Sequence, residues 1–260
     1  MSTLALQMYR ADLLKLRKKR STVIWALVVA LAPLILYFVI SALQHSSNPA
    51  NPPAGGLKGY EDSLRLLGMI FGPLAAILIG AEAGAGDAAS GVFRDLVVTG
   101  RSRFALFAAR LPAAIALSWA VAIVGYALSI LGAFVFAAGT PTPPGATIAN
   151  GFGFVMLSIG VTSALAVGFA ALTASRPAAL VAMIGWDLIA SPILQNIKSL
   201  GNARDALFSQ ALVHFSPFTF GEGPRGTAVS MSTGLAIVVL LGWLIVLIGL
   251  GAYRTRTIDA

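Results

Sequence analysis

Charged residues are scarce in this 260-residue chain, in which 11% of the residues are Asp, Glu, Lys or Arg. Those that interrupt its apolar stretches are therefore the first candidates for chemistry. The segment 80–110, GAEAGAGDAASGVFRDLVVTGRSRFALFAAR, contains Glu82, Asp87 and a series of arginines. A single acid, Asp187, stands inside the apolar stretch GWDLIASP. A desolvated carboxylate can accept hydrogen bonds from a neighbouring helix or retain its proton.

Several other kinds of chemistry have no matching residues. The chain has no Cys, which excludes disulfides, thiolate zinc sites and cysteine nucleophiles. Its two histidines, His45 and His214, are too few for a multi-histidine metal site within one chain, so no metal is expected. The glycine-rich GAEAGAG lacks the lysine of a G-x-x-x-x-G-K-[ST] phosphate loop, and neither H-E-x-x-H nor G-x-S-x-G occurs.

The elements that carry the candidate residues are predicted to be membrane-spanning helices. Hydrophobic residues make up 57% of the chain, and its charged fraction is far below the roughly 25% of a soluble domain. Spanning a bilayer takes about 20 apolar residues. We therefore expect an all-α polytopic transmembrane domain over 22–260, with six spans at 22–43, 64–83, 111–138, 148–174, 178–197 and 229–253.

The distribution of Lys and Arg predicts the side of the membrane on which each loop lies. Thirteen of these residues flank the spans on the side of the two termini, and five lie on the other side. Because Lys and Arg concentrate in cytoplasmic loops, both termini and the segment between spans two and three are expected on the inner side of a cell inner (plasma) membrane. This basic rim, rather than nucleic-acid binding, explains the net charge of +8.

Two amphipathic helices are expected outside the spans. One apolar face of residues 1–21 is formed by Leu6, Tyr9, Leu13 and Leu16. Arg10 and Arg17 flank this face, which predicts a cytoplasmic helix parallel to the membrane with its arginines near lipid phosphates. The simpler alternative is a charge cluster that only sets the topology. On the outer side, 203–215 suits a short amphipathic helix between spans five and six.

A shorter helix is expected between spans two and three. Its apolar face would consist of Val92, Phe93, Leu96 and Val97, and its polar face of Arg94 and Asp95. Gly91 precedes this helix and Gly100 follows it, which suits a glycine stop. A helix of this length is not stable alone. We expect it to pack against a partner protein or the ends of the spans, and anchoring at the lipid surface is the simpler alternative.

The same segment resembles the one that follows the second span of ABC-2 type permeases, the membrane subunits of a class of ABC exporters. The family pattern is a Glu, a Gly-Thr pair that opens a short helix, a Pro-or-Gly-x-Ser-Arg turn, and a Lys before span three. The corresponding residues here are Glu82, Gly91-Val92, Gly100-Arg101-Ser102-Arg103 and Arg110. Six spans, internal termini, an amphipathic N-terminal helix and a helical outer segment are also similar to that family.

The resemblance implies that the chain is the transmembrane permease subunit of an exporter. A homodimer or heterodimer of permeases would form the pathway, and cytoplasmic ATPase subunits would supply the energy, with ATP and Mg bound on the partner and no enzymatic activity on this chain. The short helix would dock on the ATPase, with Arg101, Arg103 and Arg110 holding its base at the anionic inner surface. The apolar pathway favours a hydrophobic or amphipathic substrate, such as a drug, antibiotic, lipid or peptide.

Asp187 and Glu82 are the candidate translocation or interhelical residues. An acid at the bilayer centre costs about 2.5–3.5 kcal/mol on insertion scales. We therefore expect Asp187 either to support transport or to form a hydrogen bond at a helix–helix or protomer interface. Glu82 is expected to be an interfacial or N-cap-like residue tied to the following segment. Two other functions stay open: an integral-membrane enzyme acting on lipid or peptide, and an ion-coupled secondary transporter.

Overall fold

The structure is a computed structural model that describes residues 3–89, 102–218 and 231–257, and within these ranges it is helical and contains no strand. Six helical stretches are long and apolar enough to cross a membrane. They are Arg20–Ser47, Gly56–Asp87, Arg103–Val135, Gly145–Thr173, Arg176–Asn196 and Thr233–Thr257. The predicted all-α architecture with six candidate spans is confirmed. The short helix expected over 91–97 lies outside the described residues.

Four of the spans are single helices, namely α2 (Arg20–Ser47), α6 (Arg103–Val135), α7 (Gly145–Thr173) and α11 (Thr233–Thr257). The second span is divided into α3 (Gly56–Leu66), the π-helical turn η1 (Leu67–Phe71) and α4 (Gly72–Ala89). The fifth is divided into α8 (Arg176–Gly185), the π-helical turn η2 (Trp186–Ala190) and α9 (Ser191–Asn196). The remaining helices are α1 (Thr3–Lys18), the 3₁₀ segment η3 (Lys198–Ala206) and α10 (Phe208–His214).

Helix α7 forms the centre of the bundle. In its most apolar window 78% of the residues are buried, compared with 22% in α2 and 17% in α11. Two glycines on α4 bring that helix close to α7. A Cβ atom at Gly84 would lie 2.5 Å from the Val167 carbonyl oxygen, and one at Gly80 would lie 2.6 Å from the Ala166 Cβ. This pair of glycines, four residues apart, is therefore a helix-packing motif of the kind common in membranes.

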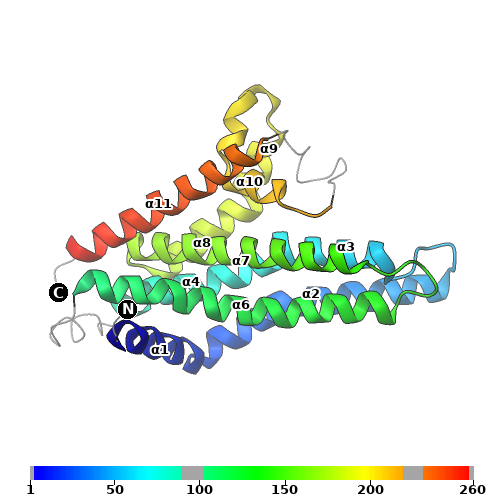
Figure 1. Ribbon diagram of the computed structural model, residues 1–260, viewed down its shortest axis with the longest axis horizontal. Helices are drawn as coiled ribbons and strands as arrows, with labels where there is room; N and C mark the ends of the chain where they lie inside the picture. The colour runs from blue at the N-terminus through cyan, green and yellow to red at the C-terminus, as the bar shows by residue number, and fades with distance from the viewer. Residues whose placement is uncertain (1–2, 90–101, 219–230, 258–260) are drawn as a thin grey trace.

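The C-terminal end of helix α11 contacts the bundle, and from there the helix slopes away from the bundle toward α9 and α10 (Figure 1). At the crossing, a Cβ on Gly251 would lie 2.5 Å from the Gly168 carbonyl oxygen of α7. At Gly234, Gly242 and Gly249 a Cβ would meet open space. Of these four glycines, Gly251 is thus the one that close helix contact requires.

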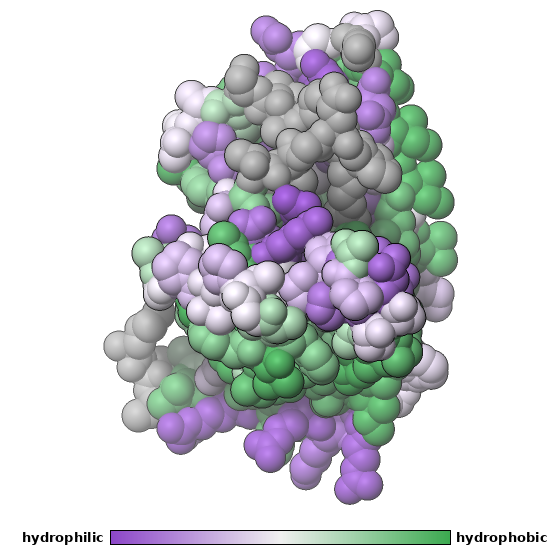
Figure 2. Space-filling view, turned by 90° about the vertical axis from the view of Figure 1, so that its right-hand side faces the viewer, coloured by the Kyte–Doolittle hydropathy of each residue, from purple (hydrophilic) through white to green (hydrophobic). Residues whose placement is uncertain are grey.

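The two ends of the chain lie at the same end of the bundle (Figure 1). The opposite end faces the viewer in Figure 2, where hydrophilic side chains lie across the middle of the face and hydrophobic ones lie below them and along the right-hand side. Large exposed apolar side chains are spread along α2, α6, α8, α9 and α11, and they include Trp25, Val181 and Ile245. Such surfaces suit contact with lipid or with another membrane protein.

Two local expectations differ from the structure. The second span begins at α3, because Tyr60 and Leu64 are fully buried and turn part of the expected outer loop into a helix. The single helix expected over 203–215 is divided at Leu207, whose backbone is extended, into η3 and α10. Phe208, Ala211 and Leu212 of α10 are buried, so this helix packs against protein rather than exposing its apolar face to lipid.

Candidate functional site

A cluster of ion pairs centred on two buried acids lies at the end of the bundle that carries the chain termini. It joins α1, α4, α6 and α8, four elements that are far apart in the sequence. Its two central acids, Glu82 and Asp87, are 2% and 4% exposed. Each accepts contacts from two cations.

Asp87 connects α4 with α1 and α6. The Lys15 ammonium group of α1 lies 2.5 Å from Asp87 Oδ1, and the Arg110 guanidinium group of α6 donates to Asp87 Oδ2 at 3.0 Å. Arg110 also donates to the Gly84 carbonyl oxygen at 3.4 Å. Because Arg110 is itself 4% exposed, its charge is neutralised inside the protein.

Glu82 connects α4 with α8 and with the junction between α1 and α2. Arg176, the first residue of α8, pairs with Glu82 Oε2 at 2.9 Å. Lys19, which separates α1 from α2, pairs with Glu82 Oε1. Arg176 also donates to the Thr22 hydroxyl at 3.5 Å. The first, second and fifth spans are thereby linked through one carboxylate.

The spacing of the two acids on α4 explains why they choose different partners. Five residues advance an α-helix by about 140°, so Glu82 and Asp87 project from different faces. Gly80 and Gly84, which pack against α7, lie within about 60° of Asp87 and on the far side of the helix from Glu82. Both acids lie in the C-terminal half of α4, and they pair with different cations. Desolvated carboxylates of this kind require paired cations.

Two expectations about these residues are corrected. Glu82 is not an N-cap residue, because it lies inside α4, seven residues before that helix ends, and its buried carboxylate instead makes interhelical ion pairs with Lys19 and Arg176. Arg110 does not reach the membrane surface, because it is buried against Asp87. Glu82 and Arg110 each pair with a residue that is distant in the sequence, Arg176 and Asp87 respectively. Neither partner can be identified from the local sequence.

A third acid, Asp12 of α1, lies at the edge of this cluster. Its carboxylate is 3.8 Å from the Lys15 ammonium group. Burial raises the pKa of Asp12 above its usual value, and the attraction of Lys15 and Arg110 offsets this only in part. Ionisation of Asp12 is therefore less favourable in the folded protein than in water.

The docking residues expected from the sequence lie between the end of α4 and the start of α6. Gly91, Val92, Phe93, Arg94, Asp95, Leu96, Val97 and Arg101 are outside the described residues. Ser102 caps α6 by accepting from the Ala105 N–H at 3.1 Å. Arg103 donates to the Arg256 carbonyl oxygen at 3.1 Å, and the Arg256 guanidinium lies over the Phe104 ring. The start of α6 is thus held against the end of α11.

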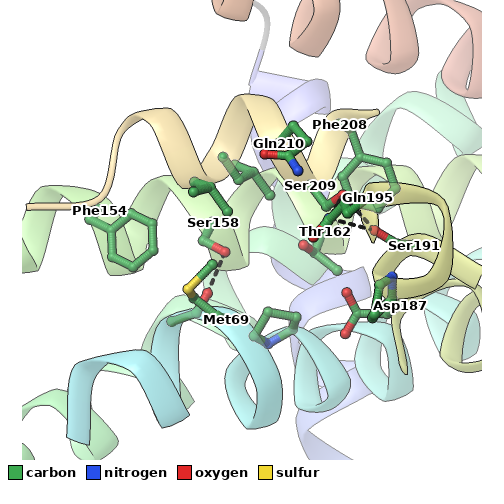
Figure 3. Close-up of a pocket in the computed structure, with 15 residues that line it drawn as sticks. Met69, Phe154, Ser158, Thr162, Asp187, Ser191, Gln195, Phe208, Ser209 and Gln210 are labelled. Atoms are coloured by element: carbon green, nitrogen blue, oxygen red, sulfur yellow. Dashed lines mark hydrogen bonds between the residues drawn. The ribbon is translucent and has the colours of Figure 1, made fainter. Parts of the chain in front are cut away.

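A second polar feature surrounds Asp187 (Figure 3). Residues of η1, α4, α7, η2, α9 and α10 line a partly enclosed cavity, with Asp187, Ser158 and Thr162 among its polar groups. Asp187 follows Arg176 by eleven residues, about 16 Å along a helix, which is about half the hydrocarbon thickness of about 30 Å. Asp187 thus lies near the middle of the fifth candidate span, and we call the cavity beside it the mid-depth cavity.

Hydrogen bonds tie one wall of this cavity together. Gln195 donates to the Ser191 hydroxyl at 3.0 Å and to the Ser209 hydroxyl at 2.8 Å, and the two serines are 2.6 Å apart. On the facing wall, Ser158 donates to the Gly68 carbonyl oxygen at 2.6 Å. The cavity has a volume of about 30 Å³, which leaves room for about two water molecules. The polar wall can thus hydrate or bind a small polar group.

Two distorted helical turns face this cavity, and each stands in the same relation to a proline. In η1 the Gly72 N–H bonds to the Leu67 carbonyl, one residue before Pro73. In η2 the Ser191 N–H bonds to the Trp186 carbonyl, one residue before Pro192. Proline has no N–H to donate, which weakens the regular ladder there. Such π-turns are frequent at functional sites.

The spacing of polar residues in spans four and five is a sequence signal for the cavity. Asp187, Ser191 and Gln195 recur every four residues in span five, and Ser158 and Thr162 do so in span four. Residues at this spacing share one helix face. A polar face within an apolar helix therefore marks both walls. For the ion pairs the signal is weaker, because no spacing within one helix identifies Lys15, Lys19 or Arg176 as partners.

The two histidines take part in ordinary contacts. His45 Nδ1 lies 2.7 Å from the Asn51 carbonyl oxygen, and His214 Nε2 lies 3.0 Å from the Thr233 hydroxyl. Among the described residues there is no group of three or more His, Cys, Asp or Glu placed to hold a metal ion. No protein-family model matches the chain, and no curated protein matches it.

Proposed function

We propose that the chain is the transmembrane permease subunit of an ABC exporter, which works as a dimer and is driven by a separate cytoplasmic ATPase subunit. Two lines of support combine. One is the resemblance of the segment from Glu82 to Arg110 to ABC-2 type permeases, and the other is the arrangement of the helices that enter and leave that segment.

The ion-pair cluster is the observation that carries the proposal. A segment that transmits force from a soluble ATPase needs a stiff base, because a flexible base would absorb the displacement. Here α4 is bonded to α1 and α6 through Asp87 and to α8 through Glu82. The start of α6 is held to α11 through Arg103. A push on residues 91–101 would therefore act on five helices together.

The mid-depth cavity supports an amphipathic substrate or its polar group. Its polar wall stands in an otherwise apolar bundle, and the turns η1 and η2 on either side are weak points at which the second and fifth spans can bend. A drug, antibiotic, lipid or peptide with one polar group fits this chemistry. In the present arrangement the cavity is too small for such a molecule, so transport would require it to widen.

The test is partnership with an ATPase. Purified from its native membrane, the chain should carry an ATP-binding subunit, and ATP and Mg should be bound on that subunit. Phe93→Asp should abolish this association or uncouple hydrolysis from transport, because truncating a buried aromatic anchor costs about 2 kcal/mol or more at an interface.

Phe136→Asp provides the matched control. It is the same change at an exposed aromatic residue just beyond α6, at the opposite end of that helix, and it should leave ATPase binding intact. Transport that persists without any ATPase would instead favour an ion-coupled secondary transporter. Chemical turnover of lipid or peptide by the isolated chain would favour a membrane enzyme.

A further inference from the structure

Helix α1 has two opposite polar faces. At 100° per residue, Asp12 and Lys15 lie on the face turned toward the ion-pair cluster. Arg10 and Arg17, seven residues apart, lie together on the opposite face. Both arginines are exposed, and within the described ranges neither makes an ion pair or a hydrogen bond to another residue. The ion-pair cluster therefore accounts for only two of the five charged residues of α1.

The second face of α1 borders a groove between α1, α2 and α6. The groove has a volume of about 610 Å³, and its polar lining consists of Arg10 and Arg17. Apolar side chains of all three helices form the remainder, including Leu13 and Val23. Along α6 the groove extends from Ala116 to Val124, a length of about 12 Å. It is thus basic where α1 lies and apolar along the membrane span.

We propose that this groove binds one anionic phospholipid of the leaflet on the side of the termini. The two guanidinium groups hold the headgroup phosphate, and one acyl chain lies along α6. Arginine suits this role because its planar donors match phosphate oxygens. Charge complementarity selects an anionic headgroup, since no acid lines the groove among the described residues.

The shape of the groove selects a lipid over other anions. A free phosphate would leave the apolar walls uncovered. A peptide would place backbone N–H and C=O groups against apolar side chains, where unsatisfied polar groups are costly. An acyl chain covers these walls without that penalty. Bound in this way, the lipid holds α1 against α2 and α6 from one side while Lys15 holds it to α4 from the other.

The experiment measures lipid retention by the purified protein. The chain is reconstituted in nanodiscs that contain phosphatidylcholine and phosphatidylglycerol, and native mass spectrometry then counts the lipids that remain during delipidation. We expect one phosphatidylglycerol per chain to be retained in preference to phosphatidylcholine. In R10Q/R17Q the preference should fall by about fivefold for each arginine removed.

Two further variants test general surface charge and the apolar part of the groove. K18Q/R20Q removes two exposed cations from the same region that do not line the groove, and it should retain the lipid. Ala120 is exposed, so Ala120→Leu fills the groove without disturbing the interior. It should lose the retained lipid, while in the delipidated state its thermal unfolding should match that of the delipidated wild type, and it tests the site even where R10Q/R17Q fails to fold.

Three results would overturn the proposal. They are equal retention of the two lipids by the wild type, unchanged preference in R10Q/R17Q, and an equal loss in K18Q/R20Q, which would indicate general surface charge. Displacement of the lipid by soluble glycerol phosphate would also count against it, because the apolar groove would then contribute nothing. None of these outcomes depends on whether an ATPase binds the chain.

Discussion

The guanidinium group of Arg110 on α6 lies 3.0 Å from the carboxylate of Asp87 on α4, and both side chains are 5% exposed. Lys15 of α1 shares the same carboxylate. One acid thus holds together the N-terminal helix and the two helices that border residues 90–102. Neutralising that acid would remove the carboxylate that pairs with the buried Arg110, and it would leave the partly exposed Lys15 with only the more distant Asp12 carboxylate at 3.8 Å.

Asp87→Asn should therefore lower the free energy of unfolding by about 3–5 kcal/mol, the usual cost of removing one partner of a buried pair. Asp62→Asn is the matched control, because Asp62 pairs with Arg65 at 3.4 Å with both side chains about one-third exposed. Such a pair contributes about 0–1 kcal/mol. Thermal unfolding in detergent measures the destabilisation caused by each variant. Equal destabilisation would show that the buried pair stabilises the protein no more than the exposed pair does.

Asp12→Asn should change how stability depends on pH. Burial raises the pKa of the Asp12 carboxyl above 3.8 in the folded protein. The folded state thus binds this proton more tightly than the unfolded state, and the resulting stability is present below pH 3.8 and is lost as pH rises through the folded pKa. The free energy of unfolding of the wild type should therefore fall, relative to the variant, as pH rises from below 3.8 to neutrality. Parallel curves for the two proteins would contradict this.

Asp187→Ala should impair transport and leave assembly intact, because the acid lines the mid-depth cavity. We expect a loss of about tenfold or more in transport rate, equivalent to about 1.4 kcal/mol. Asp187→Asn retains hydrogen bonding and separates the role of charge from that of shape. If Asp187 is instead an interhelical bond, complex yield should fall, with a cost of about 0.6 kcal/mol for a typical bilayer hydrogen bond. Normal transport together with normal yield would exclude both roles.

The orientation of the spans can be tested by cysteine labelling, since the native chain has no Cys. Ala50 follows α2 and Thr257 ends α11, and both are exposed. The charge distribution predicts that an impermeant reagent labels Ala50→Cys in intact cells and Thr257→Cys only after permeabilisation. Ala54 is an unsuitable reporter, because it is 2% exposed. The reverse labelling pattern would invert the topology.

The six spans could be predicted from the sequence because the property that defines them is local. Each needs only enough consecutive apolar residues to cross the bilayer, as in the stretch from Arg20 to Ser47. The polar face of span five is equally local, since Asp187, Ser191 and Gln195 share it by spacing alone. These features would be present in each helix before any two helices met.

The partners of the buried charges were decided by tertiary structure. Lys15 and Asp87 are 72 residues apart in sequence, and Lys19 and Glu82 are 63 apart. Helical periodicity places a residue on a face but does not determine which helix that face meets, nor the tilt at which the two cross. Close packing through Gly80 and Gly84 sets the position of α4 against α7. Only that packing turns Glu82 and Asp87 from two charges in an apolar segment into a connection between the helices of the bundle.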